Sequence, residues 1–412
     1  MKIAFLYMNI GSGVGVGSGY VFASIPDEHE RHFFNVPQYQ TAYETTRWLL
    51  ISNYDLVMIS TSTLFAPLAF QIAVAVHSHV PVLLGGIHAI IFGGELLRDH
   101  PELDYVCTGE GETFVQEFLK KWKTPEFFEI PGLAYRKGTE IVVNPEGPLE
   151  DLSKLPEFPW KAFPKLMNER GFIYFHVARG CRFACTYCGN SVCLRKYGRA
   201  YLRQRPISKV IEEMQHFRDT YHPKLFFFEV EEMFSELDWA TELFQAVKDQ
   251  VGVPYGCMAR SESLNADLVS FMKRTGCEYV GIGVECGDED YRRSVLKRFT
   301  TTQEILESFR LCNEAGFLTT SYNMIGYPTE RDEEICRTTI ALNRELNPGI
   351  FQVTWFYPFP GTVLGDYCRE NNLIDLNKIG QMHTYHGQGS VLKMHGAKPA
   401  DPHEYLRSLG GW

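Results

Sequence analysis

The segment Gly180-Cys181-Arg182-Phe183-Ala184-Cys185-Thr186-Tyr187-Cys188-Gly189-Asn190 predicts both the fold and the chemistry of this chain. Its three cysteines follow the spacing C-x3-C-x2-C, with the aromatic Tyr187 directly before the last of them. This spacing suits one tight loop that presents three thiolates to a single inorganic centre. Iron–sulfur clusters are held by cysteine thiolates, usually four for each 4Fe–4S cluster. Three ligands leave one iron open, and an open metal position is what chemistry requires.

The same cysteines allow two other interpretations. Disulfides need an oxidising compartment, but the N-terminus shows no charged-then-apolar leader, and eleven cysteines among 412 residues do not form a disulfide framework. Zinc is the stronger alternative, because Cys193 could be a fourth ligand and four-cysteine sites are common. Zinc ligands usually come in two separate pairs, which the run C-x3-C-x2-C-x4-C does not provide. We therefore favour the open cluster at Cys181, Cys185 and Cys188 and keep a non-catalytic zinc-binding protein as the alternative.

The composition predicts several domains and neither a nucleic-acid nor a membrane partner. At 47.2 kDa the chain is too long for one ordinary domain, and its 45% hydrophobic residues suffice for buried cores. The formal charge of −10 implies no broad attraction to nucleic acid or to an anionic membrane. Apolar runs such as 55–60 and 81–84 are far too short to span a bilayer. We expect a cytoplasmic protein, and an oxygen-sensitive cluster suits an anaerobic setting.

The first 125 residues alternate between strand-like and helix-like patterns. Short apolar runs at 2–8, 55–60, 81–84 and 105–108 read as buried strands, and the residues between them fit helices. Such alternation predicts a doubly wound, Rossmann-like parallel sheet, whose ligands bind at the carboxyl ends of the strands. The glycine-rich segment 11–19 matches neither a dinucleotide fingerprint nor a P-loop, so we interpret it as a loop. The predicted strand ends are small, polar and glycine-rich: Ser60-Thr61-Ser62-Thr63, Gly85-Gly86-Ile87-His88-Ala89 and Gly109-Glu110-Gly111-Glu112.

Residues 126–170 predict a connector, a small hairpin followed by a proline-rich crossing. From 171 to 365 the α/β alternation resumes, and six or so units fit a partial (β/α)6 barrel of the TIM type. Barrel sites lie at the carboxyl ends of strands. The cysteine loop follows the first of these strands. Polar residues follow the next three, and they are Glu229, Glu231, Glu232, Arg260 and Glu285.

The cysteine spacing, with Tyr187 in place, resembles the radical S-adenosylmethionine (SAM) superfamily. The resemblance implies a 4Fe–4S cluster on the three cysteines, with SAM bound at the open iron and its adenine against Tyr187 and the backbone at Gly189. It implies that an acidic group after the second strand meets the SAM amino group, and that the end of the fourth strand, at Glu285, meets the ribose. Glu231-Glu232-Met233-Phe234 stands where relatives often show D-D-x-F, which leaves open which glutamate faces SAM. Arg260 belongs to the same set of cofactor-binding candidates.

The first domain resembles the cobalamin-binding domain that precedes many radical SAM domains. In that family the corresponding loops line the corrin and its nucleotide tail. One feature departs from the pattern, because cobalamin proteins often place a cobalt-ligating histidine in D-x-H-x-x-G, whereas Asp27-Glu28-His29-Glu30-Arg31-His32 has histidine in place of the glycine. We interpret His29 as a solvated histidine in a charged loop, which leaves the lower cobalt ligand open. The corrin candidates are Ser60, Thr61, Ser62, Gly85, Gly86, His88, Gly109 and Glu110.

The resemblance implies a cobalamin-dependent radical SAM C-methyltransferase. Its expected reaction comprises reductive SAM cleavage at the cluster, hydrogen abstraction from an unactivated carbon, and methyl transfer from methylcobalamin, with a flavodoxin or ferredoxin as electron donor. Two alternatives keep the cluster, an oxidation or cyclisation without methyl transfer and a first domain empty of corrin. The substrate is a small molecule or biosynthetic intermediate that the sequence does not name. The C-terminal extension 366–412 is either substrate-facing or plain surface, and its candidates are Tyr367, His383, Tyr385, His386, His395 and Trp412.

Overall fold

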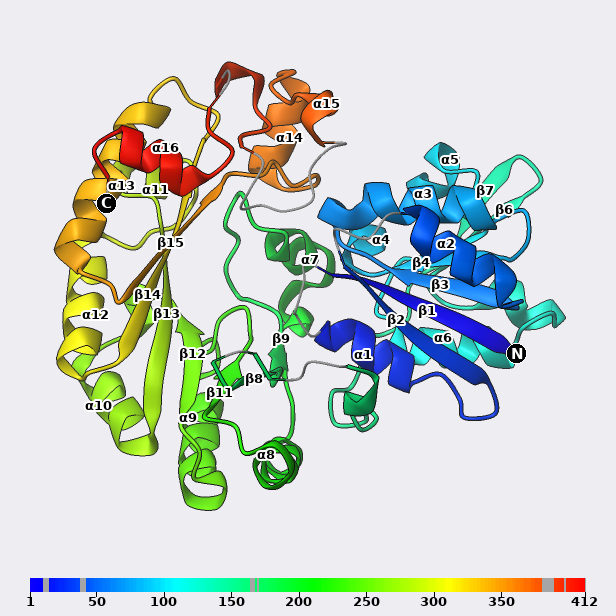
Figure 1. Cartoon of the computed structure of the whole chain (residues 1–412), viewed down its shortest axis with the longest axis horizontal. Helices are drawn as coiled ribbons and strands as arrows, with labels where there is room; N and C mark the ends of the chain where they lie inside the picture. Colours follow the sequence, from blue (N-terminus) through cyan, green and yellow to red (C-terminus); the bar gives the residue numbers. More distant parts are fainter. Residues whose placement is uncertain are drawn as a thin grey trace. The chain divides into compact units, whose positions relative to one another are not determined.

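The structure is a computed structural model that describes residues 1–9, 15–37, 42–163, 167–168, 170–379, 389–395 and 398–411. The chain forms two compact units, Met1–Leu166 and Met167–Trp412, each with its own sheet (Figure 1). Part of the glycine-rich segment 11–19 lies outside the described residues, as do His383, Tyr385, His386 and Trp412. No helix in the described part of the chain is long and apolar enough to cross a membrane.

The first unit contains a seven-stranded sheet in the order β2-β1-β3-β4-β5-β6-β7. The first five strands pair in parallel. The order 2-1-3-4-5 is that of a flavodoxin-like doubly wound sheet, and its ligand crevice lies where the order reverses, between β1 and β3. The Rossmann-like prediction is therefore confirmed. The parallel strands are β1 (Lys2–Asn9), β2 (Glu30–Pro37), β3 (Leu56–Ser60), β4 (Val82–Gly85) and β5 (Tyr105–Cys107).

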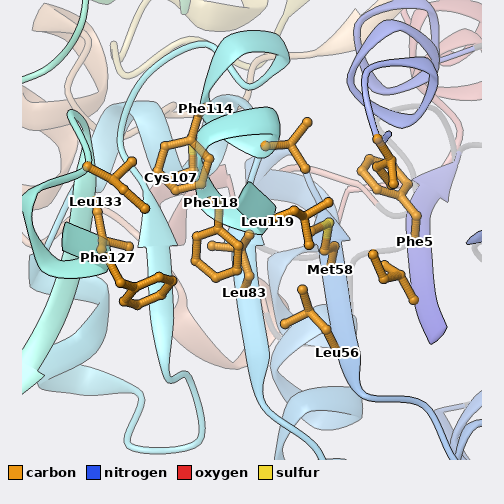
Figure 2. Packing of buried hydrophobic residues seen from close by; sticks show 14 of the residues in the cluster. Phe5, Leu56, Met58, Leu83, Cys107, Phe114, Phe118, Leu119, Phe127 and Leu133 are labelled. Carbon is orange, nitrogen blue, oxygen red and sulfur yellow. The ribbon is translucent and has the colours of Figure 1, made fainter. Parts of the chain in front are cut away.

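Helices cover both faces of this sheet because its strands are apolar on both sides. On one face Phe114, Phe118 and Leu119 pack against Met58 and Leu83, as Figure 2 shows. On the other face the strands meet Ala69, Ile72 and Ala73, which are buried. The helices of the first face are α1 (Val16–Ala23) and α6 (Glu112–Lys120), and the others are α2 (Ala42–Ile51), α3 (Ala66–Val76), α4 (Ile87–Phe92) and α5 (Glu95–Asp99) (Figure 1).

Two segments of the first unit differ from the sequence interpretation. Residues 30–37 form β2 rather than a charged loop, because the strand lies at the sheet edge, pairs only with β1, and has a polar start. The hairpin β6 (Leu133–Lys137) and β7 (Glu140–Val143), predicted as part of a connector, pairs antiparallel with β5 and extends the sheet. Leu133 and Ala134 are fully buried, which explains why the hairpin stays with the first unit.

The second unit contains a six-stranded parallel sheet in the chain order β8-β11-β12-β13-β14-β15. Helices lie along the outer side of its strands (Figure 1). The partial (β/α)6 prediction is confirmed. The strands are β8 (Phe172–Phe175), β11 (Leu225–Phe228), β12 (Tyr255–Ala259), β13 (Cys277–Glu285), β14 (Leu318–Ile325) and β15 (Ile350–Trp355). The outer helices are α8 (Ile207–Tyr221), α9 (Leu237–Ala246), α10 (Ala266–Thr275), α12 (Thr302–Glu314) and α13 (Asp332–Leu346).

Local signals in the second unit mostly match the structure. Asn265 caps α10, and Gly276 ends it with φ +98°. Thr301 and Glu304 form the capping box of α12. The predicted strand at 172–178 instead ends at Phe175, because β9 (Ala178–Arg179) turns away to pair antiparallel with β10 (Arg203–Gln204).

The C-terminal segment packs onto the second unit. Helix α16 (Pro402–Ser408) places Tyr405 against Trp355 of β15, with ring centroids 5.4 Å apart. Lys398 forms an ion pair of 2.7 Å with Asp332, whose carboxylate also accepts the backbone amides of Gly326 and Tyr327. Lys398 and Tyr405 of the predicted extension therefore belong to this unit's packing, whereas Tyr367 is 48% exposed. The chain between β15 and this segment includes α14 (Val363–Glu370) and α15 (Leu376–Ile379).

Candidate functional site

The three cysteines lie in one loop that runs from β9 into α7 (Asn190–Tyr197). Gly180 opens this loop with φ +100°, and a Cβ there would lie 2.3 Å from the carbonyl oxygen of Tyr201. The turn closes through the backbone amide of Cys188, which donates to the carbonyl of Cys185 at 3.2 Å. Ser191 then bonds the carbonyl of Cys188 through both its amide and its hydroxyl. The backbone thus holds the predicted ligands before any metal is added.

Thr186 joins the cysteine loop to two later segments of the chain, one after β13 and one after β15. Its amide donates to the carbonyl of Leu296 and its hydroxyl to the carbonyl of Val295, at 3.2 and 2.7 Å. Its own carbonyl accepts the amide of Leu364 at 2.9 Å. Tyr187, the next residue, packs against the apolar cluster that contains Tyr327. Sequence reasoning missed Thr186, because its partners are more than a hundred residues away.

The sulfur atoms lie in an enclosed environment with one cation beside them. Burial raises the pKa of the Cys181 thiol to about 11 and that of Cys188 to about 12, and the Cys185 sulfur adds to both. A coordinated metal deprotonates such thiols outright. The buried guanidinium of Arg260 approaches the Cys185 sulfur to 3.5 Å and stacks on Phe183, 3.7 Å from the ring centroid. Arg260, predicted as a cofactor-binding residue, therefore belongs to the surroundings of the cysteines.

A cluster and a closed zinc site place different demands on the cysteine sulfurs. A tetrahedral zinc with bonds of about 2.3 Å requires sulfurs within about 4 Å of one another. Among the residues that the structure describes, no three His, Cys, Asp or Glu side chains converge closely enough to hold one metal ion. A cluster spreads its thiolates over separate irons and does not need that convergence. Cys193, the possible fourth zinc ligand, is buried on α7.

The two glutamates after β11 differ in what they contact. Both oxygens of Glu232 accept hydrogen bonds, from the amide of Phe234 at 3.1 Å and the hydroxyl of Ser235 at 2.7 Å, so this buried carboxylate holds its own turn. Desolvation raises the pKa of Glu231, and a hydrogen bond from the backbone amide of Gly180 opposes that rise. Both glutamates lie near the cysteine loop, because the charge of Glu232 also raises the pKa of Cys181, but both oxygens of Glu232 are engaged in its own turn.

Glu285 ends β13 in a conformation that few residues adopt. Its φ is +66°, and the pairing register with β14 shifts at this point. The Glu285 carboxylate lies 3.7 Å from the Arg298 guanidinium, which also donates to the carbonyl of Gly283 at 2.5 Å. A Cβ on Gly283 would lie 2.6 Å from that carboxylate, so a larger residue there would displace the Glu285 side chain. Nothing in the sequence around Arg298 identified it as the partner of Glu285.

A second pair connects the end of β12 to the segment before α12. Arg260 forms an ion pair with Glu262 at 2.5 Å, and the Glu262 carboxylate accepts the hydroxyl of Thr300 at 2.6 Å. Glu262 and Thr300 are likewise residues that sequence reasoning did not select. The arrangement fixes the orientation of Arg260 toward the cysteine loop.

In the first unit the predicted residues lie at the carboxyl edge of the parallel strands. Ser60 ends β3, and its hydroxyl lies 2.8 Å from that of Ser18 on α1. Gly86 has φ +88°, and a Cβ there would lie 2.6 Å from the carbonyl oxygen of Thr61. Only glycine therefore fits at this turn. Thr61 is buried, and Ser62 is half-buried beside it. This edge borders the reversal of strand order between β1 and β3.

Two glycines of this edge have room around them. A Cβ on Gly85 or on Gly109 would meet no atom closer than 3.8 Å. A Cβ at that distance makes only ordinary van der Waals contact, so packing does not require glycine at either position. Glu110 instead has a structural contact, since its carboxylate accepts the amide of Glu150 at 2.7 Å.

His88 is buried below the same edge. Its Nδ1 lies 3.3 Å from the Thr63 hydroxyl, and the rings of Phe70 and Phe92 flank it. Burial, followed by the charge of His100, lowers the pKa of His88 to about 4. The imidazole is therefore neutral near pH 7 and is shielded by aromatic rings.

His29 lies at the opposite edge of the sheet. It comes directly before β2, whose first residue pairs with Lys2 at the start of β1. Its Nδ1 lies 3.2 Å from the amino group of Met1. Since the ligand crevice of a doubly wound sheet lies at the carboxyl edge, His29 is not placed to reach a corrin there.

Comparison with known proteins identifies the second unit. Residues 175–339 match the family model of the Radical SAM superfamily. An uncharacterised methyltransferase of Pyrococcus horikoshii is 25% identical over 374 residues, which cover 88% of this chain and 80% of that protein. The anaerobic magnesium-protoporphyrin IX monomethyl ester cyclase of Cereibacter sphaeroides is 24% identical over 331 residues, covering 76% of this chain but only 52% of the cyclase.

The fold of the chain is similar to one that has been solved. The radical S-adenosylmethionine methyltransferase TsrM from Kitasatospora setae, solved with cobalamin and a [4Fe-4S] cluster, superposes with a TM-score of 0.70 at 16% sequence identity. The superposition covers 90% of this chain and 78% of TsrM. At this identity the likeness concerns the fold, which combines a doubly wound domain with a partial barrel.

Proposed function

Because this chain is an enzyme with a radical SAM domain at residues 175–339, we propose that it is a cobalamin-dependent radical SAM methyltransferase. The observation that carries the proposal is the preformed cysteine loop, in which Cys181, Cys185 and Cys188 are held beside Arg260 at the carboxyl end of the barrel strands. The methyltransferase name of the Pyrococcus relative supports methyl transfer, and the cobalamin in the solved TsrM structure supports cobalamin as the second cofactor. The substrate is a small molecule.

In this proposal the cluster would supply the electron that cleaves SAM, and a bound corrin would carry the methyl group that reaches the substrate carbon. Cys181, Cys185 and Cys188 would hold the cluster. Glu231 would accept the SAM amino group, because it accepts a hydrogen bond from Gly180 of the cysteine loop, whereas both oxygens of Glu232 are engaged in its own turn. Tyr187, Gly189 and Glu285 would bound the nucleoside, with Arg298 holding Glu285 in place.

The corrin would bind at the carboxyl edge of the first unit's sheet. Gly85 and Gly109, which packing does not require to be glycine, and the tight turn at Gly86 support this assignment. Ser60, Thr61, Ser62 and the shielded His88 would complete the edge. Cleavage of SAM needs a low-potential electron donor, which we propose is a flavodoxin or ferredoxin.

A second candidate function is an oxidation or cyclisation with the same cofactors and no methyl transfer. The anaerobic cyclase is similar to this chain over 76% of its length, and this similarity supports the second candidate function. The two functions differ in the fate of the SAM methyl group. With reduced corrin and methyl-labelled SAM, a methyltransferase moves label onto the corrin, whereas the alternative leaves all label in SAM and its cleavage products.

The cysteines provide the sharper test of the cluster. We expect Cys185→Ala, after anaerobic reconstitution, to lose most of its iron and all reductive formation of 5′-deoxyadenosine from SAM. Cys193→Ala is the matched control, because this buried cysteine should keep both the iron content and the cleavage. Zinc without acid-labile sulfide in the native protein, or loss of metal only in Cys193→Ala, would overturn the proposal.

A further inference from the structure

Two sulfurs of the cysteine loop have hydrogen-bond donors that belong to the loop's own backbone. The amide of Phe183 donates to the Cys181 sulfur, and the amide of Asn190 donates to the Cys188 sulfur. Both donors are uncharged, and each amide lies two residues after the cysteine that it contacts. Hydrogen bonds to the cysteine sulfurs are among the factors that set the reduction potential of an iron–sulfur cluster.

The third sulfur has a donor of a different kind. Nη1 of Arg260 lies 3.5 Å from the Cys185 sulfur, and both residues are buried, with exposed fractions of 7% and 6%. A charged donor forms a stronger hydrogen bond than a neutral one, and burial leaves its charge weakly screened. Arg260 also reaches the loop from another strand, since it directly follows β12, 75 positions along the chain from Cys185.

All three nitrogens of Arg260 have a protein partner. Its Nε and Nη2 lie 2.6 and 2.5 Å from one oxygen of Glu262, whose other oxygen accepts the Thr300 hydroxyl at 2.6 Å. The guanidinium also stacks on Phe183, 3.7 Å from the ring centroid. These contacts direct the remaining nitrogen, Nη1, toward Cys185. The protein itself therefore fixes the guanidinium at the sulfur, without a bound cofactor.

This contact has a defined effect on a cluster held by the cysteines. Reduction adds one electron, so the thiolate sulfurs carry more negative charge in the reduced state than in the oxidised state. A positively charged donor at one sulfur stabilises the reduced state more and raises the reduction potential. The effect is local, because Glu262 balances the charge of Arg260 at a distance while it binds a different edge of the guanidinium.

We propose that Arg260 is a positioning residue that sets the reduction potential of the cluster through the Cys185 sulfur. This inference rests on the proposed function, because it requires the cluster at the three cysteines. By raising the potential, Arg260 makes electron transfer from a flavodoxin or ferredoxin less unfavourable.

The test measures the midpoint potential of the anaerobically reconstituted cluster in the absence of SAM, by a redox titration followed by electron paramagnetic resonance. We expect Arg260→Met to make reduction at least tenfold less favourable, a fall of about 59 mV for one electron. Arg182→Met is the matched control, because Arg182 also lies over the Phe183 ring, 5.1 Å from its centroid, but is exposed to solvent. The control should change the reduction equilibrium by less than twofold.

A further variant separates the potential from a defect in folding. Arg260→Met leaves the Glu262 carboxylate without its ion-pair partner, so Arg260→Met/Glu262→Gln removes both charges together. This double variant should bind as much iron and sulfide as the native protein and still show the lowered potential.

Three outcomes would overturn the inference. They are an unchanged potential in the double variant, an equal fall in Arg182→Met, and a double variant that assembles no cluster, which would make Arg260 a residue of cluster assembly. A residue that only bound SAM would also leave this potential unchanged, because SAM is absent from the titration. Each of these outcomes leaves the proposed function standing, whereas a native protein without a cluster would overturn both.

Discussion

Gly180 shows at the scale of one residue how the cysteine loop depends on backbone geometry. Its φ of +100° and the carbonyl of Tyr201 at 2.3 Å from a would-be Cβ leave no alternative to glycine. Gly189, nine residues later, has φ −56°, and a Cβ there would meet no atom within 4 Å. Packing therefore does not require glycine at this position. The two glycines of one motif therefore have different reasons for being glycine.

We predict that Gly180→Ala loses the cluster while Gly189→Ala retains it. The alanine at 180 combines an unfavourable φ with a backbone clash, a strain of about 1–3 kcal/mol that a shift of the loop would relieve. Iron and acid-labile sulfide per chain after reconstitution measure the outcome. Equal iron contents in the two variants would contradict the argument.

His88 gives a prediction about pH. Its pKa is about 4 in the folded protein and 6.5 when unfolded, so the unfolded state binds more protons between these values. The stability due to neutral His88 is complete above pH 6.5 and is lost as the pH falls toward 4, by up to about 3 kcal/mol. In urea unfolding followed at pH 7 and pH 4.5, we expect His88→Gln to lose less stability than the native protein. A parallel decline of both would show that His88 does not contribute.

At the scale of elements, helix caps fix where the outer helices of the half-barrel begin. The Thr301 hydroxyl accepts the amide of Glu304, and the Glu304 carboxylate accepts the amide of Thr301 at 2.7 Å. This places α12 so that Ile305 and Phe309 are buried inward. Helix α12 packs against β14, so the position of the helix supports that strand.

We therefore predict that Thr301→Ala lowers the free energy of unfolding by about 1 kcal/mol. Iron content should not change, because the neighbouring Thr300 keeps the hydroxyl that holds Glu262 and, through it, Arg260. Thr241→Ala is the control, since that exposed hydroxyl bonds only carbonyls of its own helix. Thermal unfolding of the three proteins measures the difference, and an equal loss in the control would rule out a specific capping effect.

At the scale of the whole chain, each unit presents chemistry-bearing residues at the carboxyl ends of its parallel strands. In the first unit this places Gly85 at the ligand edge and His29 at the other. We predict that His29→Ala binds hydroxocobalamin as the native protein does, within twofold, and that its cobalt(II) electron paramagnetic resonance spectrum is unchanged.

Gly85→Leu provides the matched variant at the ligand edge. Since a Cβ at Gly85 would meet no atom closer than 3.8 Å, the leucine would project into the ligand edge, so corrin affinity should fall at least tenfold while the sheet stays folded. Equilibrium titration by absorbance measures both variants. The opposite result, with His29→Ala weakened and Gly85→Leu unaffected, would place the corrin elsewhere.

The predictable part of this protein lies in signals a few residues long. The cysteine spacing, the capping box at Thr301 and the glycine ending α10 act through local hydrogen bonds and dihedral angles, so they can be read directly. The strand β2 could not be predicted from the sequence, because a polar edge strand carries no apolar run. The hairpin at β6 and β7 was recognised as a hairpin, but its partner β5 lies outside the segment.

The sequence by itself determined the two α/β units, the cysteine loop and the strand ends on which the candidate residues lie, since each follows from local periodicity and spacing. Only the tertiary structure decided which of these residues meet. It engaged Glu232 in its own turn, paired Glu285 with Arg298, and placed His29 at the far edge. The reason is physical: a side chain's partners lie on other strands, and the distance between strands in space does not depend on their separation along the chain.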